Sequence, residues 1–197
     1  MSEQPNSIET VRISHKFWSH KISPQAKIIV IGTFNPGHVC NQENNFFYSG
    51  SRNKFWKLLP EAVGESFDLR KSAVEQKVEF SSRWHIDFID IISEVCVEVG
   101  QECNRKDDYL DGRVTKWRDV IRELEGFPSI KCACFTRKTF SDVPKIGEKV
   151  KEIEAYLQSR SIVFRFLHTP ARAYSRALPE WKSFFEHYQK MTNDYQS

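Results

Sequence analysis

Short runs of β-branched and aromatic residues alternate along the chain with longer segments in which apolar residues recur every three or four positions. Apolar runs of roughly four to eight residues are typical of buried strands, and the wider spacing is typical of amphipathic helices. Residues 100–113 are polar and irregular and are predicted to form a loop. The predicted strands are Lys27–Gly32, Ile86–Ile92 with a turn or helix at its end, Ile130–Phe135 and Ser161–Leu167. The predicted helices are a segment through Phe55–Leu59 that Ser51 could cap, then Asp68–Val78, Val114–Glu125, Lys145–Leu157 and a last helix that Pro179 opens.

This alternation predicts a three-layer α/β/α fold around a central, mostly parallel, four-stranded sheet. The crossovers between parallel strands should be right-handed. We expect one domain over residues 1–197, with residues 1–20 as an N-terminal appendage. In sheets of this kind, ligands bind beyond the carboxyl ends of the strands. The loop after Gly32 and the segment after Leu167 both fall there.

The composition excludes several classes of protein. Of the 197 residues, 40% are hydrophobic and 13% aromatic, which excludes a disordered or low-complexity chain. No apolar run approaches the roughly 18 residues of a membrane span, and the polar N-terminus has no signal-peptide pattern. The five cysteines form no Cys-x-x-Cys pair, so we expect no zinc or iron–sulfur site. This cysteine usage favours a reducing, cytoplasmic compartment.

Positive charges are concentrated in two segments that are far apart in the sequence. The net charge is only +3, but residues 10–60 carry seven Lys or Arg and one acid, and residues 155–179 carry four Arg and no acid. If these segments meet in the fold, they form a positive face that suits a polyanion. The alternative is that these side chains are simply solvated.

Residues that could bind a ligand or take part in a reaction follow the first predicted strand. In Gly32-Thr-Phe-Asn-Pro-Gly37, Gly and Pro favour a tight turn whose backbone N–H groups can face one spot, and Asn35 places an amide at the mouth of the sheet. The alternative is an ordinary turn in which Asn35 bonds its own backbone. Further along, Tyr48 precedes a predicted helix on a polar loop, where it could stack on a base or cover the edge of the core.

A third polar stretch, Leu167-His-Thr-Pro-Ala-Arg-Ala-Tyr-Ser175, follows the last predicted strand. His168 comes directly after the strand, Pro170 favours a turn, and Arg172 leads into a short helix. The N-terminus of such a helix would bind phosphate. The alternative is that His168 is a hydrogen-bonded histidine of the core.

Taken in order, these stretches resemble the motifs of the uracil-DNA glycosylase superfamily, and within it those of the mismatch-specific uracil/thymine glycosylases and the hypoxanthine-DNA glycosylases. Phe34-Asn-Pro-Gly37 is similar to the turn that follows the first strand in that superfamily. Tyr48, four further residues and Asn53-Lys-Phe-Trp56 are similar to its aromatic residue and Asn-x-Phe-Trp motif. The superfamily has a second motif after its last strand, of the type His-Pro-Ser-Pro or Ser-Pro-Ala-Asn. In this chain that position has His168-Thr-Pro-Ala-Arg172 instead. The base preference therefore stays open.

The resemblance implies a monofunctional DNA glycosylase of base excision repair, which hydrolyses the N-glycosidic bond of a damaged or mispaired base flipped out of DNA. The base would be uracil, hypoxanthine or mispaired thymine. Asn35 would orient the attacking water, and His168 and the backbone N–H groups near Phe34 would stabilise the departing base. Tyr48 would stack on that base. The implied substrate-binding residues are Phe34, Tyr48, Asn53 and Thr169, and the implied DNA contacts are Arg52, Lys54, Arg172 and Arg176.

Several alternatives stay open beside this interpretation. Asn53 could instead bond the backbone of the turn after Gly32. Asp87 and Asp90 are rival carboxylates, because they stand three residues apart in an apolar stretch and either could activate the water; the alternative is that Asp90 caps a turn. The resemblance implies no metal or organic cofactor, and we expect DNA as the partner, no membrane and a monomer. The alternative functions are a catalytically silent DNA-binding or lesion-sensing domain with the same fold, and an α/β enzyme acting on free nucleosides or nucleotides.

Overall fold

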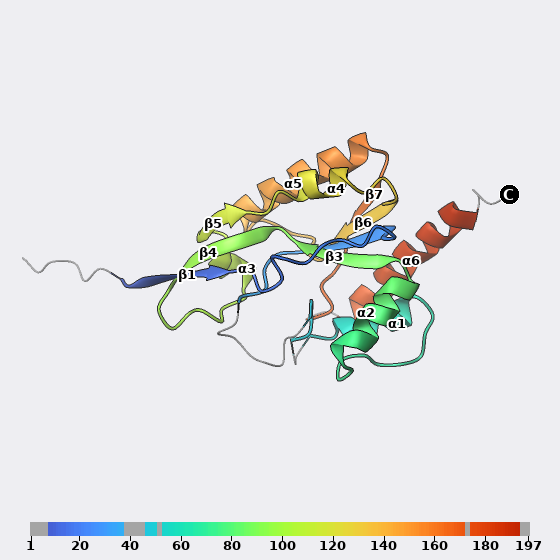
Figure 1. The fold of residues 1–197 in the computed structure, drawn as a ribbon, viewed down its shortest axis with the longest axis horizontal. Helices are drawn as coiled ribbons and strands as arrows, with labels where there is room; N and C mark the ends of the chain where they lie inside the picture. Colours follow the sequence, from blue (N-terminus) through green and yellow to red (C-terminus); the bar gives the residue numbers. More distant parts are fainter. Residues whose placement is uncertain (1–7, 38–45, 51–52, 172–173, 194–197) are drawn as a thin grey trace, which may run out of the picture.

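A parallel sheet of four strands forms the centre of the molecule in the computed structural model, which describes residues 8–37, 46–50, 53–171 and 174–193 (Figure 1). The strand order is β3-β2-β6-β7, and every neighbouring pair is parallel. This confirms the predicted α/β fold with a central parallel sheet. The strands are β2 Ile28–Gly32, β3 Ile86–Asp90, β6 Cys132–Phe135 and β7 Val163–Phe166.

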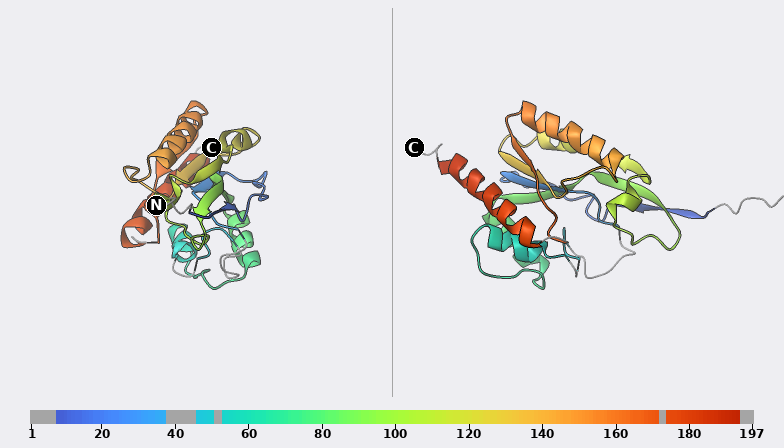
Figure 2. Two further views of the ribbon diagram at one scale, coloured as in Figure 1. Left: turned by 90° about the vertical axis from the view of Figure 1, so that its left-hand side faces the viewer. Right: turned by 180° about the vertical axis from the view of Figure 1, so that it is seen from behind.

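Helices cover both faces of this sheet and give the three predicted layers. α4 and α5 lie on one face, and α1, α2 and α6 lie on the other (Figures 1 and 2). The helices are α1 Phe55–Ala62, α2 Val74–Arg83, α4 Val120–Glu125, α5 Pro144–Ser159 and α6 Tyr174–Asn193.

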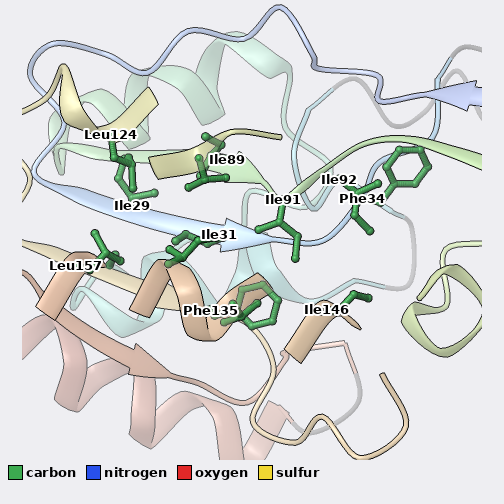
Figure 3. Close-up of a cluster of buried hydrophobic side chains, with 14 of the residues drawn as sticks. Ile29, Ile31, Phe34, Ile89, Ile91, Ile92, Leu124, Phe135, Ile146 and Leu157 are labelled. Atoms are coloured by element: carbon green, nitrogen blue, oxygen red, sulfur yellow. The ribbon is translucent and has the colours of Figure 1, made fainter. Parts of the chain in front are cut away.

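The side chains of β2 alternate between two hydrophobic clusters, one on each face of the sheet. Ile29 and Ile31 pack into the cluster that includes α4 and α5 (Figure 3), whereas Ile28 and Val30 pack into the cluster beneath α1, α2 and α6. Each such side chain contributes about 1.5–3 kcal/mol when it is fully buried. Because β2 is buried on both faces, it is a firm base for the loop that follows it.

A second sheet of three antiparallel strands, in the order β1-β4-β5, extends the molecule beyond the end of β3. β3 runs into β4 with only Ile91 between them. β1 pairs with β4 and so joins the N-terminal segment to the rest of the fold. The strands are β1 Thr10–Ser14, β4 Ile92–Glu98 and β5 Val114–Trp117, and a short helix, α3 Asp107–Leu110, lies between β4 and β5.

The sequence pattern does not predict this second sheet. The prediction of one helix over Val114–Glu125 is wrong, because the segment divides into β5 and α4. Asp119 separates the two elements: its side chain accepts a hydrogen bond from the Arg122 backbone N–H and so caps α4. The turn or helix expected after Ile92 is instead β4, whose buried residues pack into the same cluster as Ile29.

Two helices also begin at other residues than predicted. α2 begins at Val74 and not at Asp68: Asp68 accepts a hydrogen bond from the Arg70 backbone N–H in a turn, and the helix start is marked by the Ala73 backbone N–H donating to Gln76 Oε1. α6 begins at Tyr174, so the prediction that Pro179 opens the last helix is wrong. The helix continues through Pro179 because the residues around it, Ala177 and Trp181, are fully buried, and this burial offsets the missing backbone hydrogen bond. Ser51, the predicted cap of α1, lies outside the described residues.

None of the described helices has the length and apolar character that a membrane span requires. Among the described cysteines, Cys96, Cys132 and Cys134 carry free thiols. Cys103 is disulfide-bonded, which the cysteine pattern does not predict.

Candidate active site

The loop after β2 is fastened to the end of β1. Pro36 forms an isolated antiparallel bridge with His15. The Lys16 backbone N–H donates to the Asn35 carbonyl at 2.8 Å, and the Gly37 backbone N–H donates to the Ser14 carbonyl at 2.9 Å. The backbone around Asn35 is therefore held from outside the central sheet, by a segment about 20 residues earlier in the chain.

The Asn35 side chain is fixed by a buried carboxylate. Its Nδ2 donates to Asp90 Oδ2 at 2.6 Å, and Asp90, the last residue of β3, is 2% exposed. Asp90 is the register partner of Gly32 on β2. A carboxylate only accepts hydrogen bonds, so this contact decides which way the amide is turned. Oδ1 is the Asn35 side-chain atom that faces away from Asp90 and can accept a bond from a ligand. Asp90 therefore does not act as the predicted turn cap in these contacts.

His15 is a second buried partner of Asp90. Its Nε2 lies 2.7 Å from Asp90 Oδ2, and both side chains are 2% exposed. Its Nδ1 accepts a hydrogen bond from the Phe17 backbone N–H at 3.0 Å. The His15 ring also contacts Phe34 edge-on, with centroids 5.6 Å apart. Phe34 is buried in the core, so its side chain supports the loop.

Tyr48 lies against the same end of β2. Its ring stacks on Phe55 with centroids 4.2 Å apart, and its hydroxyl lies 3.5 Å from Thr136 Oγ1, just after β6. A Cβ on Gly32 would lie 2.6 Å from this hydroxyl and 2.3 Å from Asp90 Oδ1, so only glycine fits there. Burial, and next the nearby charge of Asp90, raise the pKa of Tyr48 well above 10.0, so the hydroxyl stays protonated at neutral pH.

The backbone of Tyr48 is strained. Its φ angle is 56°, in the left-handed region that bulky residues rarely adopt. Such a conformation costs on the order of 1–3 kcal/mol and persists where surrounding contacts hold it, which is common at functional sites. Here the stack on Phe55 holds the ring.

A second carboxylate borders the loop. Thr33 Oγ1 donates to Asp107 Oδ1 at 2.7 Å, and Arg137 Nη1 donates to Asp107 Oδ2 at 3.0 Å. Burial raises the pKa of Asp107, while the Thr33 hydrogen bond and the Arg137 charge oppose the shift. Thr33 is thereby anchored to α3, two residues before Asn35.

His168 lies on the same edge of the sheet but apart from Asn35. It follows β7, and β6 stands between β7 and β2, so the two strands that lead to these residues are two strand spacings apart, about 10 Å. Both the backbone N–H and Nδ1 of His168 contact Glu180 Oε2, at 3.0 and 2.9 Å. Its carbonyl accepts from Trp181 Nε1 at 3.1 Å. Nε2 is therefore the His168 nitrogen that Glu180 does not engage.

The other two predicted substrate-binding residues make local bonds. Asn53 Oδ1 accepts from the Phe55 backbone N–H at 3.0 Å, which organises the start of α1. The predicted alternative, a bond to the turn after Gly32, is not what this oxygen makes. Thr169 Oγ1 accepts a weak bond from the Ala171 backbone N–H at 3.4 Å.

Comparison with known proteins supports the fold. No family model and no curated protein matches the chain. A similar solved structure is the solution NMR structure of a candidate uracil DNA glycosylase from Methanosarcina acetivorans, with a TM-score of 0.56 and 20% identity over 84% of this chain and 92% of that one. The fold is uracil-DNA-glycosylase-like. At this identity the likeness concerns the fold, so the chemistry has to follow from the residues themselves.

The two basic segments of the sequence meet on this glycosylase-like fold. Lys54 and Lys57, at the start of α1, place their ammonium groups 5.6 and 5.4 Å from the ring centroid of Tyr174, at the start of α6. Arg176, two residues further along the first turn of α6, is exposed. Arg52 and Arg172, two of the four predicted DNA contacts, lie outside the described residues.

Sequence reasoning missed His15. The sequence carries a weak signal for it: Val11, Ile13 and His15 are alternate residues and so point to the same face of a strand, and Ile13 and His15 are buried. A histidine that continues the inward-facing positions of a strand is a candidate for a buried polar contact. Within the described residues, no three His, Cys, Asp or Glu side chains gather as a metal-binding group.

Proposed function

We propose that the chain is a monofunctional DNA glycosylase that hydrolyses the N-glycosidic bond of uracil, hypoxanthine or mispaired thymine flipped out of DNA, in base excision repair. The proposal rests on one observation above all: at the carboxyl end of β2, the Asn35 amide is fixed by buried Asp90 with Oδ1 left to accept. This edge of a parallel sheet is where such folds bind ligands. The glycosylase-like fold and the motif resemblance support the same interpretation.

In the proposed reaction, Asn35 Oδ1 accepts a hydrogen bond from a water and directs its oxygen at C1′ of the flipped nucleotide. A C1′–oxygen bond forms, the C1′–nitrogen bond breaks, and the base leaves with the bonding electron pair. The attacking water gives one proton to solvent. Because the departing base carries negative charge, donors placed around it lower the barrier. Backbone N–H groups near Phe34 are the proposed donors, and Nε2 of His168 joins them when the ring is protonated, because its Nδ1 faces the Glu180 carboxylate.

The Tyr48 ring is proposed to hold the base. One face of the ring is covered by Phe55, so the base would stack on the opposite face. Stacking of this kind is worth roughly 1–3 kcal/mol per base. A mispaired base costs less to flip than a paired one, which favours damaged sites.

Lys54 and Arg176, with Arg52 and Arg172 outside the described residues, are proposed to bind backbone phosphates. Such contacts give affinity that is independent of sequence and sensitive to salt. DNA is then the partner of a monomeric protein. We also propose the cytoplasmic location that the cysteine pattern favours, although the disulfide at Cys103 is a bond that a reducing compartment disfavours.

The test is base release from duplex oligonucleotides that carry uracil, hypoxanthine or a G·T mismatch, each followed by alkaline cleavage of the abasic site. We expect strand cleavage with at least one of these substrates and none with an undamaged duplex. No cleavage with any of them, on single- or double-stranded DNA, would contradict the proposal.

One observation favours the second candidate, a catalytically silent DNA-binding or lesion-sensing domain. The His168 backbone N–H, a donor expected to face the departing base, bonds Glu180 of α6 instead. Binding of damaged DNA at nanomolar to micromolar concentrations, without base release, would support this candidate over the enzyme.

A further inference from the structure

Two histidine–aspartate pairs tie the N-terminal segment to β3. His15 Nε2 lies 2.7 Å from Asp90 Oδ2, and His20 Nε2 lies 2.7 Å from Asp87 Oδ1. The pairs differ in what else the carboxylate holds. Asp87 accepts from the Ser23 backbone N–H, whereas Asp90 accepts from the Asn35 side chain. They also differ in burial, because the side chains of the first pair are 2% exposed and those of the second are 24% and 10% exposed.

The hydrogen-bond direction in the first pair is settled by the backbone. Since the Phe17 backbone N–H donates to His15 Nδ1, that nitrogen has no hydrogen and the neutral ring carries its hydrogen on Nε2. Nε2–H therefore donates to Asp90 Oδ2. The result is a directed chain: Phe17 N–H to His15, His15 to Asp90, and Asn35 Nδ2–H to the same Asp90 oxygen.

Asp90 is poorly placed to activate a water itself. Oδ2 already accepts two hydrogen bonds, and Oδ1 faces Gly32 beside the Tyr48 hydroxyl. With 2% exposure, neither oxygen is open to solvent. Asp90 can affect a bound ligand by orienting Asn35, because Asn35 is the partner of Asp90 that lies on the ligand-binding edge of the sheet.

We propose that His15 and Asp90 are positioning residues that lock the Asn35 side-chain amide with Oδ1 turned toward substrate. In its catalytic consequence this inference rests on the proposed glycosylase function, but the locking itself does not. A buried pair that is hydrogen-bonded to a catalytic side chain fixes the rotamer of that side chain before substrate binds. Without the pair, the amide can rotate and present Nδ2 in place of Oδ1.

The locking is tested first without any reaction. In ¹⁵N-labelled protein, the Asn35 Nδ2 hydrogens are identified by their loss in Asn35→Ala. We expect one of them to exchange slowly with water, and to exchange at least tenfold faster in Asp90→Asn and in His15→Phe, which keeps a ring but removes the donor. His15→Gln, which keeps an N–H donor, should retain part of the protection. The matched control is His20→Phe, which breaks the other pair and should leave the Asn35 hydrogens unchanged.

The catalytic consequence is tested by single-turnover base release together with affinity for DNA that contains an abasic site. We expect a loss of roughly 10- to 100-fold in the release rate for His15→Phe and Asp90→Asn, up to the loss that a misplacement of about 1 Å at the reacting centre can cause. Product-DNA affinity should stay unchanged, because neither side chain touches DNA. His20→Phe should release base at the wild-type rate.

Each result decides something. Unchanged exchange of the Asn35 hydrogens in folded Asp90→Asn and His15→Gln would overturn the locking, even if His15→Phe fails to fold. An equal loss of base release in His20→Phe would overturn the positioning role, since both pairs would then only stabilise the fold. If the wild-type protein releases no base from any substrate, the proposed function fails, while the exchange experiment still decides whether His15 and Asp90 hold Asn35.

Discussion

Gly32→Ala probes the crowding at the end of β2 with the smallest possible change. The added Cβ would lie 2.3 Å from Asp90 Oδ1 and 2.6 Å from the Tyr48 hydroxyl, both closer than van der Waals contact allows. Neither neighbour is a loose chain end: Asp90 is held by two hydrogen bonds through Oδ2, and Tyr48 is stacked on Phe55. The methyl group must therefore displace the carboxylate, the phenol or β2 itself.

The cost follows from these contacts. Overpacking a well-packed site costs typically 1–3 kcal/mol, and we take about 2 kcal/mol for one methyl group between two anchored neighbours. For a domain of this size, 1 kcal/mol corresponds to about 2–4 °C, so we expect the melting temperature to fall by about 4–8 °C. A shift of Asp90 also carries Asn35 with it, and a misplacement of about 1 Å can cost on the order of 100-fold in rate.

The assay is thermal unfolding followed by circular dichroism, with single-turnover base release measured on the same preparations. Gly112→Ala is the matched control, because a Cβ there meets nothing within 4 Å. It should melt within about 1 °C of the wild-type protein. If Gly32→Ala is as stable as Gly112→Ala and releases base at the wild-type rate, the packing of Asp90 and Tyr48 around Gly32 is wrong.

Three further predictions concern the base, the half-buried acid Asp107 and the phosphate contacts. Tyr48→Ala should weaken engagement of the flipped base by roughly 1–3 kcal/mol in single-turnover titrations, while Tyr48→Phe keeps most of it; equal behaviour of the two would remove the ring from the pocket. Burial raises the folded-state pKa of Asp107 above 3.8. The favourable contribution of Asp107 to folding stability is therefore present below about pH 4 and is lost as the pH rises through the raised pKa. Asp107→Asn should accordingly raise the melting temperature at pH 7 more than at pH 4, and a gain that does not depend on pH would contradict this assignment. Lys54→Ala and Arg176→Ala should each lower the slope of log affinity against log salt by about 1 in fluorescence anisotropy, for damaged and undamaged DNA alike, whereas Lys149→Ala on α5 should not.

The central sheet was predictable because its strands are buried on both faces. Such strands are nearly continuous apolar runs, as in Ile28–Gly32 and Cys132–Phe135, and they are recognisable without any tertiary information. β5 is half-exposed and four residues long, and its two apolar residues, Val114 and Trp117, stand three positions apart, a spacing that also fits the first turn of a helix. Its pairing with β4 decides between the two, and a pairing partner is not visible in a local pattern.

The candidate site likewise contains residues that the sequence indicates and residues that only the tertiary fold brings in. Asn35 and Tyr48 both lie at the carboxyl end of β2. Asn35 follows β2 directly, and Tyr48 precedes α1, the next helix along the chain. His168 shares the edge but lies two strands away, and its bonds to Glu180 depend on where α6 packs. His15 could not be assigned from the sequence, since its link to Asn35 arises only when β1 and β3 converge on Asp90.

The central claim is that the Asn35 amide oxygen directs the attacking water. Its most direct test is the single-turnover rate of base release by Asn35→Ala, measured beside its affinity for the same DNA and beside Gln158→Ala, an exposed amide on α5. The account predicts a loss of at least about 100-fold in rate with DNA affinity nearly unchanged, and a wild-type rate for Gln158→Ala. A rate for Asn35→Ala within a few-fold of wild type would contradict it.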